Sequence, residues 1–294
     1  DNIAIGNNAL GATTTANGNV GIGTSALLAS TTGGNTAVGY FALKTQSGSD
    51  CISNTAVGRE ALELNTEGAF NTAVGRDALE NNTTADNNTA VGYLALNQNT
   101  TGNSLVAVGS AALDANTTGD YNVAVGLNAL GGTTTSNSNT GIGYSAGLAN
   151  TTGANNTALG SVSLLSNTTA SNNTAIGKSA LQNNTTGAEN SALGSSALDG
   201  NTTGASNLAV GFEALKVNST GAANVAIGHK ALLSNTTASS NTACGKDALR
   251  TNTTGQYNVA VGTYSLDGNT TGQQNTAVGY VALGANTEGI YNTA

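Results

Sequence analysis

The stretch Asn275–Leu283, with the sequence NTAVGYVAL, is one copy of a unit that recurs along the whole chain. Its glycine returns every seventeen residues from Gly58 to Gly279, and the three earlier gaps, starting at Gly6, are 17, 16 and 19 residues. A fixed short period is typical of solenoids, in which each repeat mainly contacts its neighbours. We therefore predict a single repeat array of about seventeen coils over residues 1–294. Because the chain begins and ends inside repeats, we expect it to be a segment of a longer protein.

The composition narrows the function classes. The chain has 40 Gly, no Pro, Met or Trp, and only 8% charged residues, with a net charge of −8. A nucleic-acid partner would require a basic stripe, and the sequence has none. A membrane span would require about twenty consecutive apolar residues, and no such run occurs in this segment.

Each coil follows the pattern N-T-A-V-G-x-x-A-L-x-x-N-T-T-G-x-x, which we number from 1 to 17, starting at the Asn. Branched residues at positions 2 to 4 predict a short β-strand, and the invariant Gly at position 5 predicts a turn. Positions 8 and 9 are predicted as a second short strand or an extended corner, and NTTG as another turn. The expected fold is an all-β parallel β-solenoid.

Stacked coils place each position on its own copy about 4.8 Å away. Leu, Val and Ala are expected to form internal columns, and Asn side chains at positions 1 and 12 to form hydrogen-bonded ladders. The residues that we assign to structural columns are Asn173 (position 1), Val210 and Cys244 (position 4), Gly160 and Gly177 (position 5), and Leu181 and Leu215 (position 9).

Side chains alternate across a strand, so positions 2 and 4 share one face and position 3 has the other. Both faces are small or apolar, whereas a single solenoid has only one interior. A strand that is apolar on both faces is normally covered on both sides. The uniform Ala or Gly at position 3 also suggests the close approach of another backbone. We therefore predict a cyclic homo-oligomer.

The two cysteines are too far apart in the array for a disulfide between them. Cys244 takes an aliphatic position and is predicted to be a small buried hydrophobe. Cys51 falls in the two-residue insertion of the third copy. It is predicted to be a plain exposed thiol, with a cross-chain bridge as the alternative.

The motif N-x-A-[VI]-G, for example NIAIG at Asn2–Gly6 and NVAIG at Asn224–Gly228, resembles the head repeats of YadA-like trimeric autotransporter adhesins (Hep/Hag repeats). The NTAVG…AL…NTTG array also resembles the shafts of phage-type tail fibres. The resemblance covers the whole chain and implies a left-handed β-roll, three of which pack side by side into a rod. The usual repeat of the family has fourteen residues, so the NTTG turn is the expected addition.

Catalytic and metal-binding sites are not expected, and neither is a cofactor. His229 is the single histidine and lies at a variable position without partners for triad or zinc chemistry. Asp77, Glu80 and Asp247 are predicted to be ordinary surface charges. The NTT segments match the glycosylation sequon, but their turn role explains them.

These observations predict a structural protein: a rigid, extracellular fibre or adhesin segment of a cell surface or a virion. Its partners would be copies of itself, as a homotrimer or an end-to-end filament, and an unidentified surface receptor. Any binding by this segment would use variable loops or the irregular copy at Ser47–Ser53. The alternative is a monomeric Thr/Asn-rich solenoid that binds ice or carbohydrate. Ice binding is disfavoured because the position-2 Thr column is interrupted by residues such as Val123 and Leu208.

Overall fold

The chain folds as an all-β parallel solenoid of about sixteen coils, most of them seventeen residues long. The structure is a computed structural model that describes residues 1–13 and 15–294. It divides into two compact units, residues 1–145 and 146–294. Each coil contributes one strand of three residues, from position 2 to position 4, as the sequence predicts.

The strands of the first unit are β1 (Ile3–Ile5), β2 (Val20–Ile22), β3 (Thr36–Val38), β4 (Thr55–Val57), β5 (Thr72–Val74), β6 (Thr89–Val91), β7 (Val106–Val108), β8 (Val123–Val125) and β9 (Thr140–Ile142). Those of the second unit are β10 (Thr157–Leu159), β11 (Thr174–Ile176), β12 (Ser191–Leu193), β13 (Leu208–Val210), β14 (Val225–Ile227), β15 (Thr242–Cys244), β16 (Val259–Val261) and β17 (Thr276–Val278).

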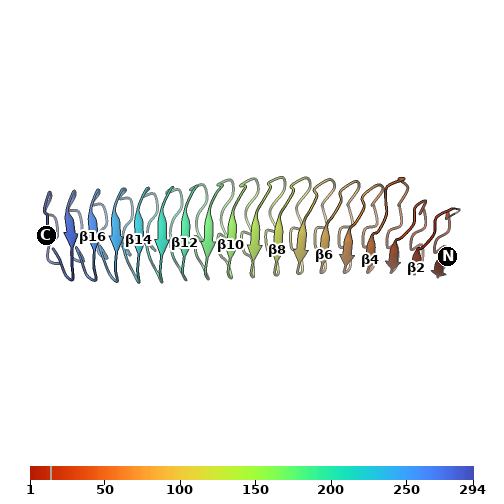
Figure 1. Cartoon of the computed structure of the whole chain (residues 1–294), viewed down its shortest axis with the longest axis horizontal. Helices are drawn as coiled ribbons and strands as arrows, with labels where there is room; N and C mark the ends of the chain where they lie inside the picture. Colours follow the sequence, from red (N-terminus) through yellow and green to blue (C-terminus); the bar gives the residue numbers. More distant parts are fainter. Residues whose placement is uncertain (14) are drawn as a thin grey trace. The chain divides into compact units, whose positions relative to one another are not determined.

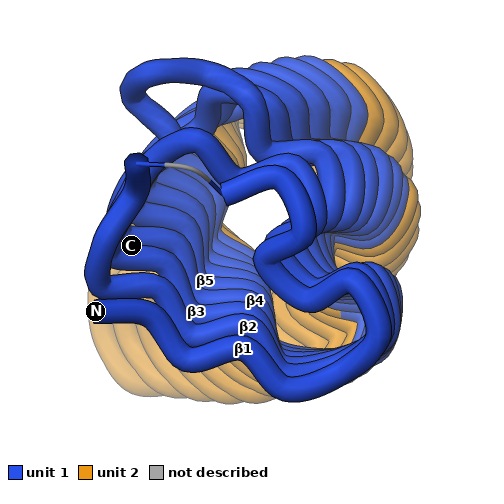
Figure 2. Tube along the Cα trace, turned by 90° about the vertical axis from the view of Figure 1, so that its right-hand side faces the viewer, with its two compact units in different colours: residues 1–145 blue, residues 146–294 orange. Residues whose placement is uncertain are grey.

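Within each unit the strands lie side by side in chain order and run in the same direction (Figure 1). Equivalent positions face each other, for example Thr55 and Thr72, and Ala56 and Ala73. Seen along the stack, the coils of the first unit overlay one another, with β1 to β5 on one side of the coil (Figure 2). Backbone hydrogen bonds between coils also continue around the turns, as from Leu79 N to the oxygen of Ala95 at 3.0 Å. Coil stacking therefore satisfies the backbone well beyond the three strand residues.

The apolar half of the interior consists of Ala at positions 3 and 8 and Leu at position 9. In most coils these side chains have no exposed surface. The predicted internal Val column is wrong, because position 4 points outward and is half-buried or exposed. The interior beside the strand is too narrow for it: a Cβ atom built on Gly21 at position 3 would lie 3.3 Å from the carbonyl oxygen of Ala26 at position 8. Position 3 thus closely approaches the backbone of its own coil rather than that of another chain.

The corner after the strand differs from the extended structure predicted for positions 8 and 9. Position 7 and position 9 both have a left-handed backbone, as at Ser179 (φ 58°) and Leu181 (φ 50°). Such a φ is unusual for a bulky residue. The conformation is stabilised because the amides of Ser179 and Leu181 donate to carbonyl oxygens of the two neighbouring coils, Ser161 and Ala197, at 3.1 and 3.0 Å. The side chain of Leu181 is completely buried.

The polar half of the interior is built by the two predicted Asn ladders, which are confirmed. At position 12, Asn82 Nδ2 donates to Asn65 Oδ1 of the preceding coil at 2.7 Å. At position 1, the backbone N–H of Asn88 donates to Asn71 Oδ1 at 2.9 Å. The side-chain amides of Asn71 and Asn82 also both donate to the carbonyl oxygen of Ala85 at position 15, at 2.8 and 3.1 Å. The polar half of such a coil is therefore closed by two Asn side-chain amides that donate hydrogen bonds to the same carbonyl oxygen.

Candidate functional site: the outer face of the sheet

The outer face of the sheet is formed by positions 2 and 4 and is the main apolar surface of the coils. Position 4 carries a branched or aliphatic side chain in almost every coil. In β4 to β7 its valines, Val57, Val74, Val91 and Val108, are each 37% exposed. Position 2 adds Thr or Val side chains that are mostly half-buried. Within each unit this gives a continuous apolar stripe one strand wide, which is of the kind that marks an interaction surface.

Two residues assigned to the core from the sequence belong to this stripe. Val210 at position 4 of β13 is half-buried, and Cys244 at position 4 of β15 is exposed. The prediction of Cys244 as a buried hydrophobe is wrong for the same reason as the Val column: position 4 lies outside. The other assigned residues lie as follows: Leu181, Leu215 and Asn173 are completely buried, and Gly160 and Gly177 have a positive φ.

The glycosylation sequons of the NTT turns are closed to modification in the folded chain. Their Asn residues at position 12, for example Asn82, Asn99, Asn116 and Asn150, are 0–1% exposed. Asn82 and Asn99 each use their Nδ2 in two hydrogen bonds. The role of these residues is therefore to hold the turn and the ladder.

The two threonines of each NTT segment play different parts. The first, at position 13, donates its hydroxyl hydrogen along the stack, as from Thr83 Oγ1 to the oxygen of Thr100 at 3.0 Å. The second, at position 14, is exposed, as at Thr84 and Thr101. The position-14 column consists of Thr84, Thr101, Thr118 and Thr135 in the first unit and Thr152, Thr169, Thr186, Thr203, Thr220, Thr237, Thr254 and Thr271 in the second.

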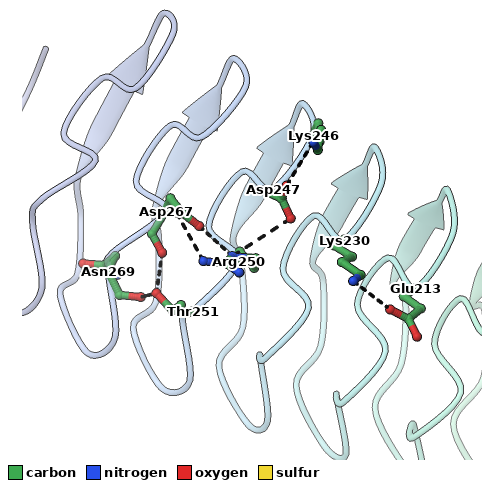
Figure 3. Close-up of polar contacts among 8 residues, drawn as sticks. All are labelled: Glu213, Lys230, Lys246, Asp247, Arg250, Thr251, Asp267 and Asn269. Carbon is green, nitrogen blue, oxygen red and sulfur yellow. Dashed lines mark hydrogen bonds and ion pairs between the residues drawn. The ribbon is translucent and has the colours of Figure 1, made fainter.

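Charged side chains gather beside the strands at positions 6, 7 and 10. In the second unit, Arg250 Nε lies 2.9 Å from Asp267 Oδ1 of the next coil and 4.0 Å from Asp247 Oδ1 of its own coil (Figure 3). Lys230 approaches Glu213 of the preceding coil at 3.6 Å (Figure 3). These cations are half exposed, so each pair contributes little to stability. Their carboxylates neutralise these two cations.

Two carboxylates predicted to be ordinary surface charges are in fact buried. Asp77 is 6% exposed and Asp247 7%. Asp77 Oδ2 pairs with Arg76 Nε at 3.0 Å, whereas its Oδ1 atom has no hydrogen-bond partner. Burial raises the pKa of Asp77, and the neighbouring Glu60 raises this pKa further, against the opposing charge of Arg76. Both aspartates occupy position 7, where the backbone is left-handed.

Cys51 is buried, so the predictions of an exposed thiol and of a cross-chain bridge are wrong. The amides of Ser47 and Gly48 bond to Thr66 as positions 13 and 14 would, so the two extra residues are Ser49 and Asp50. Cys51 thereby takes the inward place that the turn Gly or Ala has in other coils. Its Sγ accepts a hydrogen bond from Asn65 Nδ2 at 2.9 Å. Burial raises the pKa of Cys51 to about 11.

The described residues bring together no metal-binding set. His229 is exposed, and its ring stacks on Phe212 with the centroids 5.5 Å apart. In residues 1–13 and 15–294, no group of three or more His, Cys, Asp and Glu could hold a metal ion. Across the same residues there is also no helix long and apolar enough to cross a membrane.

The sequence matches no protein-family model and no curated protein. A function for this chain is therefore inferred mainly from the geometry described above.

Proposed function

We propose that the chain is a rigid structural segment of an extracellular fibre or adhesin, in which three copies pack side by side through the outer face of the sheet. The observation that carries this proposal is the apolar stripe at position 4. A single coil leaves this stripe in water, although its interior is already filled by Ala and Leu. A second copy of the same chain offers a matching stripe with the same spacing, so the occupant is the chain itself.

The resemblance to YadA-like adhesin heads and phage-type fibre shafts supports the number three and a left-handed coil. A structural role is also compatible with the described residues, which include no group that could hold a metal ion. In this arrangement the segment spaces or displays binding domains on a cell surface or virion, and the variable loops face outward.

The native mass in solution, measured by light scattering, tests this proposal. Three times 28.6 kDa is expected for the full chain. Val210→Lys places a charge in the stripe and should shift the protein toward monomer, because burial of an unpaired charge is costly. Val217→Lys is the matched control: Val217 is 48% exposed at position 11, away from the sheet face, and should leave the trimer intact. A monomeric wild-type chain, or equal effects of the two variants, would contradict the proposal.

Cys244 provides a second readout without mutation. It lies in the stripe, so a maleimide should label it slowly in the trimer and quickly at dilutions that give monomer. Equal labelling rates in both states would place the contact surface elsewhere.

The second candidate is a monomeric solenoid that binds ice or carbohydrate. The exposed Thr column at position 14, which is unbroken from Thr84 to Thr135 in the first unit and from Thr152 to Thr271 in the second, supports it better than the interrupted column at position 2. Thermal hysteresis at micromolar protein, abolished when Thr203 and Thr220 are replaced by Lys, would favour this candidate. No hysteresis is expected from the fibre segment.

A further inference from the structure

Ser49 and Asp50, the two inserted residues, line a pocket beside the irregular coil. It has a volume of about 360 Å³ and is lined by eight residues from three consecutive coils. Ser47, Gly48 and Cys51 already fill the regular turn positions, so the two inserted residues are additional to the repeat. The pocket is therefore lined partly by residues that have no counterpart in the regular coils.

The lining of this pocket combines negative charge with apolar surface. Asp50, Glu67 and Asp86 each come from a different coil, and none of the eight lining residues is Lys, Arg or His. Asp86 is held in place because its Oδ1 accepts a hydrogen bond from the amide of Ala69 at 2.7 Å. Phe70 and Ile52 are 54% and 39% exposed, and the amide of Phe70 donates to the carbonyl oxygen of Ile52 at 3.0 Å.

We propose that this pocket binds the basic side chain, Arg or Lys, of a partner protein. Three carboxylates without a cation in the lining favour a positively charged occupant. Carboxylates bind guanidinium and ammonium groups through short charge-assisted hydrogen bonds. The ring of Phe70 offers a face for the cation, and Ile52 an apolar surface for its methylene stem. This inference is independent of the oligomeric state.

The chain contains its own control for the role of the insertion. The turn NTEG occurs twice, at Asn65–Gly68 and at Asn286–Gly289. Glu288 occupies the same position 14 as Glu67, and Tyr291 the same position 17 as Phe70. The coil of Glu288, however, follows one without an insertion. A binding site that needs the pocket, and not merely a Glu near an aromatic ring, should involve Glu67 alone.

The experiment uses the full chain with Phe70→Trp, because the protein has no Trp of its own and the new residue reports on the pocket alone. The probe is an acetylated peptide amide with one Arg between Gly residues. Its matched control is the same peptide with citrulline, which keeps the shape but lacks the charge. Saturable change in Trp fluorescence with the Arg peptide and none with the citrulline peptide is expected. In this reporter chain Glu67→Gln should weaken binding about tenfold or more, and Glu288→Gln should not change it.

Calorimetry on the wild-type chain and on a chain without Ser49 and Asp50 provides the second measurement. Removing these two residues leaves a regular seventeen-residue coil, so the fold is retained and binding of the Arg peptide should be lost. The proposal is overturned if both peptides bind alike, if the shortened chain binds equally well, or if neither peptide binds. It is also overturned if free spermidine binds while the Arg peptide does not.

Discussion

At Gly177 the backbone has a φ of 129°, and a Cβ atom there would lie 2.6 Å from the carbonyl oxygen of Gly194 in the next coil. Gly177→Val therefore combines a disfavoured backbone with a clash between coils. We expect a loss of roughly 3 kcal/mol or more in the free energy of unfolding, measured by denaturant titration. Lys178→Val, at the adjacent exposed position, is the control and should change stability little. Wild-type stability of the Gly177 variant would refute the role of position 5.

The two cysteines should differ in reactivity. Cys244 is exposed, whereas Cys51 is buried and its pKa is raised to about 11, so its reactive thiolate is scarce at pH 8. We expect a thiol reagent to modify one cysteine per chain in the dissociated native protein and two after denaturation. Mass spectrometry of peptides identifies the modified residue. Rapid native modification of Cys51 would mean that the irregular coil opens.

Asp77 should make stability depend on pH in an unusual direction. Its pKa is raised by burial, so the folded state holds the proton more tightly than the unfolded chain, whose Asp pKa is about 3.9. The contribution of Asp77 is therefore greatest below that value and is lost as pH rises through the folded pKa. Asp77→Asn should raise Tm at pH 7 by about 1–3 °C and have no effect at pH 3. Glu189→Gln, at an exposed position, is the control and should leave Tm unchanged at both pH values.

At the scale of the coil, the position-12 ladder has a defect at Thr133. This residue is completely buried, and neither its Oγ1 nor Asn116 Oδ1 has a hydrogen-bond partner. Thr133→Asn would supply an Nδ2 donor of the kind that Asn116 itself offers to Asn99 at 2.8 Å. We expect stabilisation by about 1–2 kcal/mol in a denaturant titration, since Asn116 Oδ1 gains a partner and the unpaired hydroxyl of Thr133 is removed. Thr135→Asn, exposed at position 14, is the control, and an equal effect would refute the ladder argument.

The period of the sequence predicts the strands, their register and the Asn ladders, because equal spacing brings like residues together. It does not show which face of a three-residue strand is inside. Val is more apolar than Ala, so hydrophobicity places Val210 and Cys244 inside. The interior excludes them because Leu side chains from the opposite corner and the position-8 carbonyl leave room only for Ala or Gly. The left-handed backbone at Leu181 could not be predicted from the sequence. Leu at position 9 is explained by the burial of its side chain and does not indicate a positive φ.

The sequence predicts that some apolar residues must remain outside a single coil, because both faces of the strand are apolar. It does not show that these residues are the ones at position 4. The pocket at the irregular coil could not be foreseen from spacing, because its lining comes from three coils. Cys51 could have been placed correctly only by assigning the extra residues to Ser49 and Asp50, which leaves Cys51 in register with the turn glycines. Where the repeat is regular the sequence is sufficient. Where the repeat is interrupted, the side-chain contacts of the structure are needed to place residues such as Cys51.

At the scale of the whole molecule, a solenoid is stable through contacts between neighbouring coils, so a complete coil is the unit that can be removed. Deletion of residues 190–206 joins Glu189 to Asn207 and keeps every later residue at its coil position. Both ladders and the Leu column can then close across the junction. We expect cooperative unfolding with a Tm close to that of the full chain, and an unchanged number of chains in the assembly.

Deletion of residues 190–198 is the matched comparison, because it removes about half a coil and brings Asp199, from position 10, directly after position 17. The stretch that follows would then lack its strand, its Gly at position 5 and its buried Leu. Thermal unfolding followed by circular dichroism should show a lower Tm and loss of cooperativity for this variant only. Equal Tm values for the two deletions would mean that stability does not depend on register, and would contradict the columns on which this fold rests.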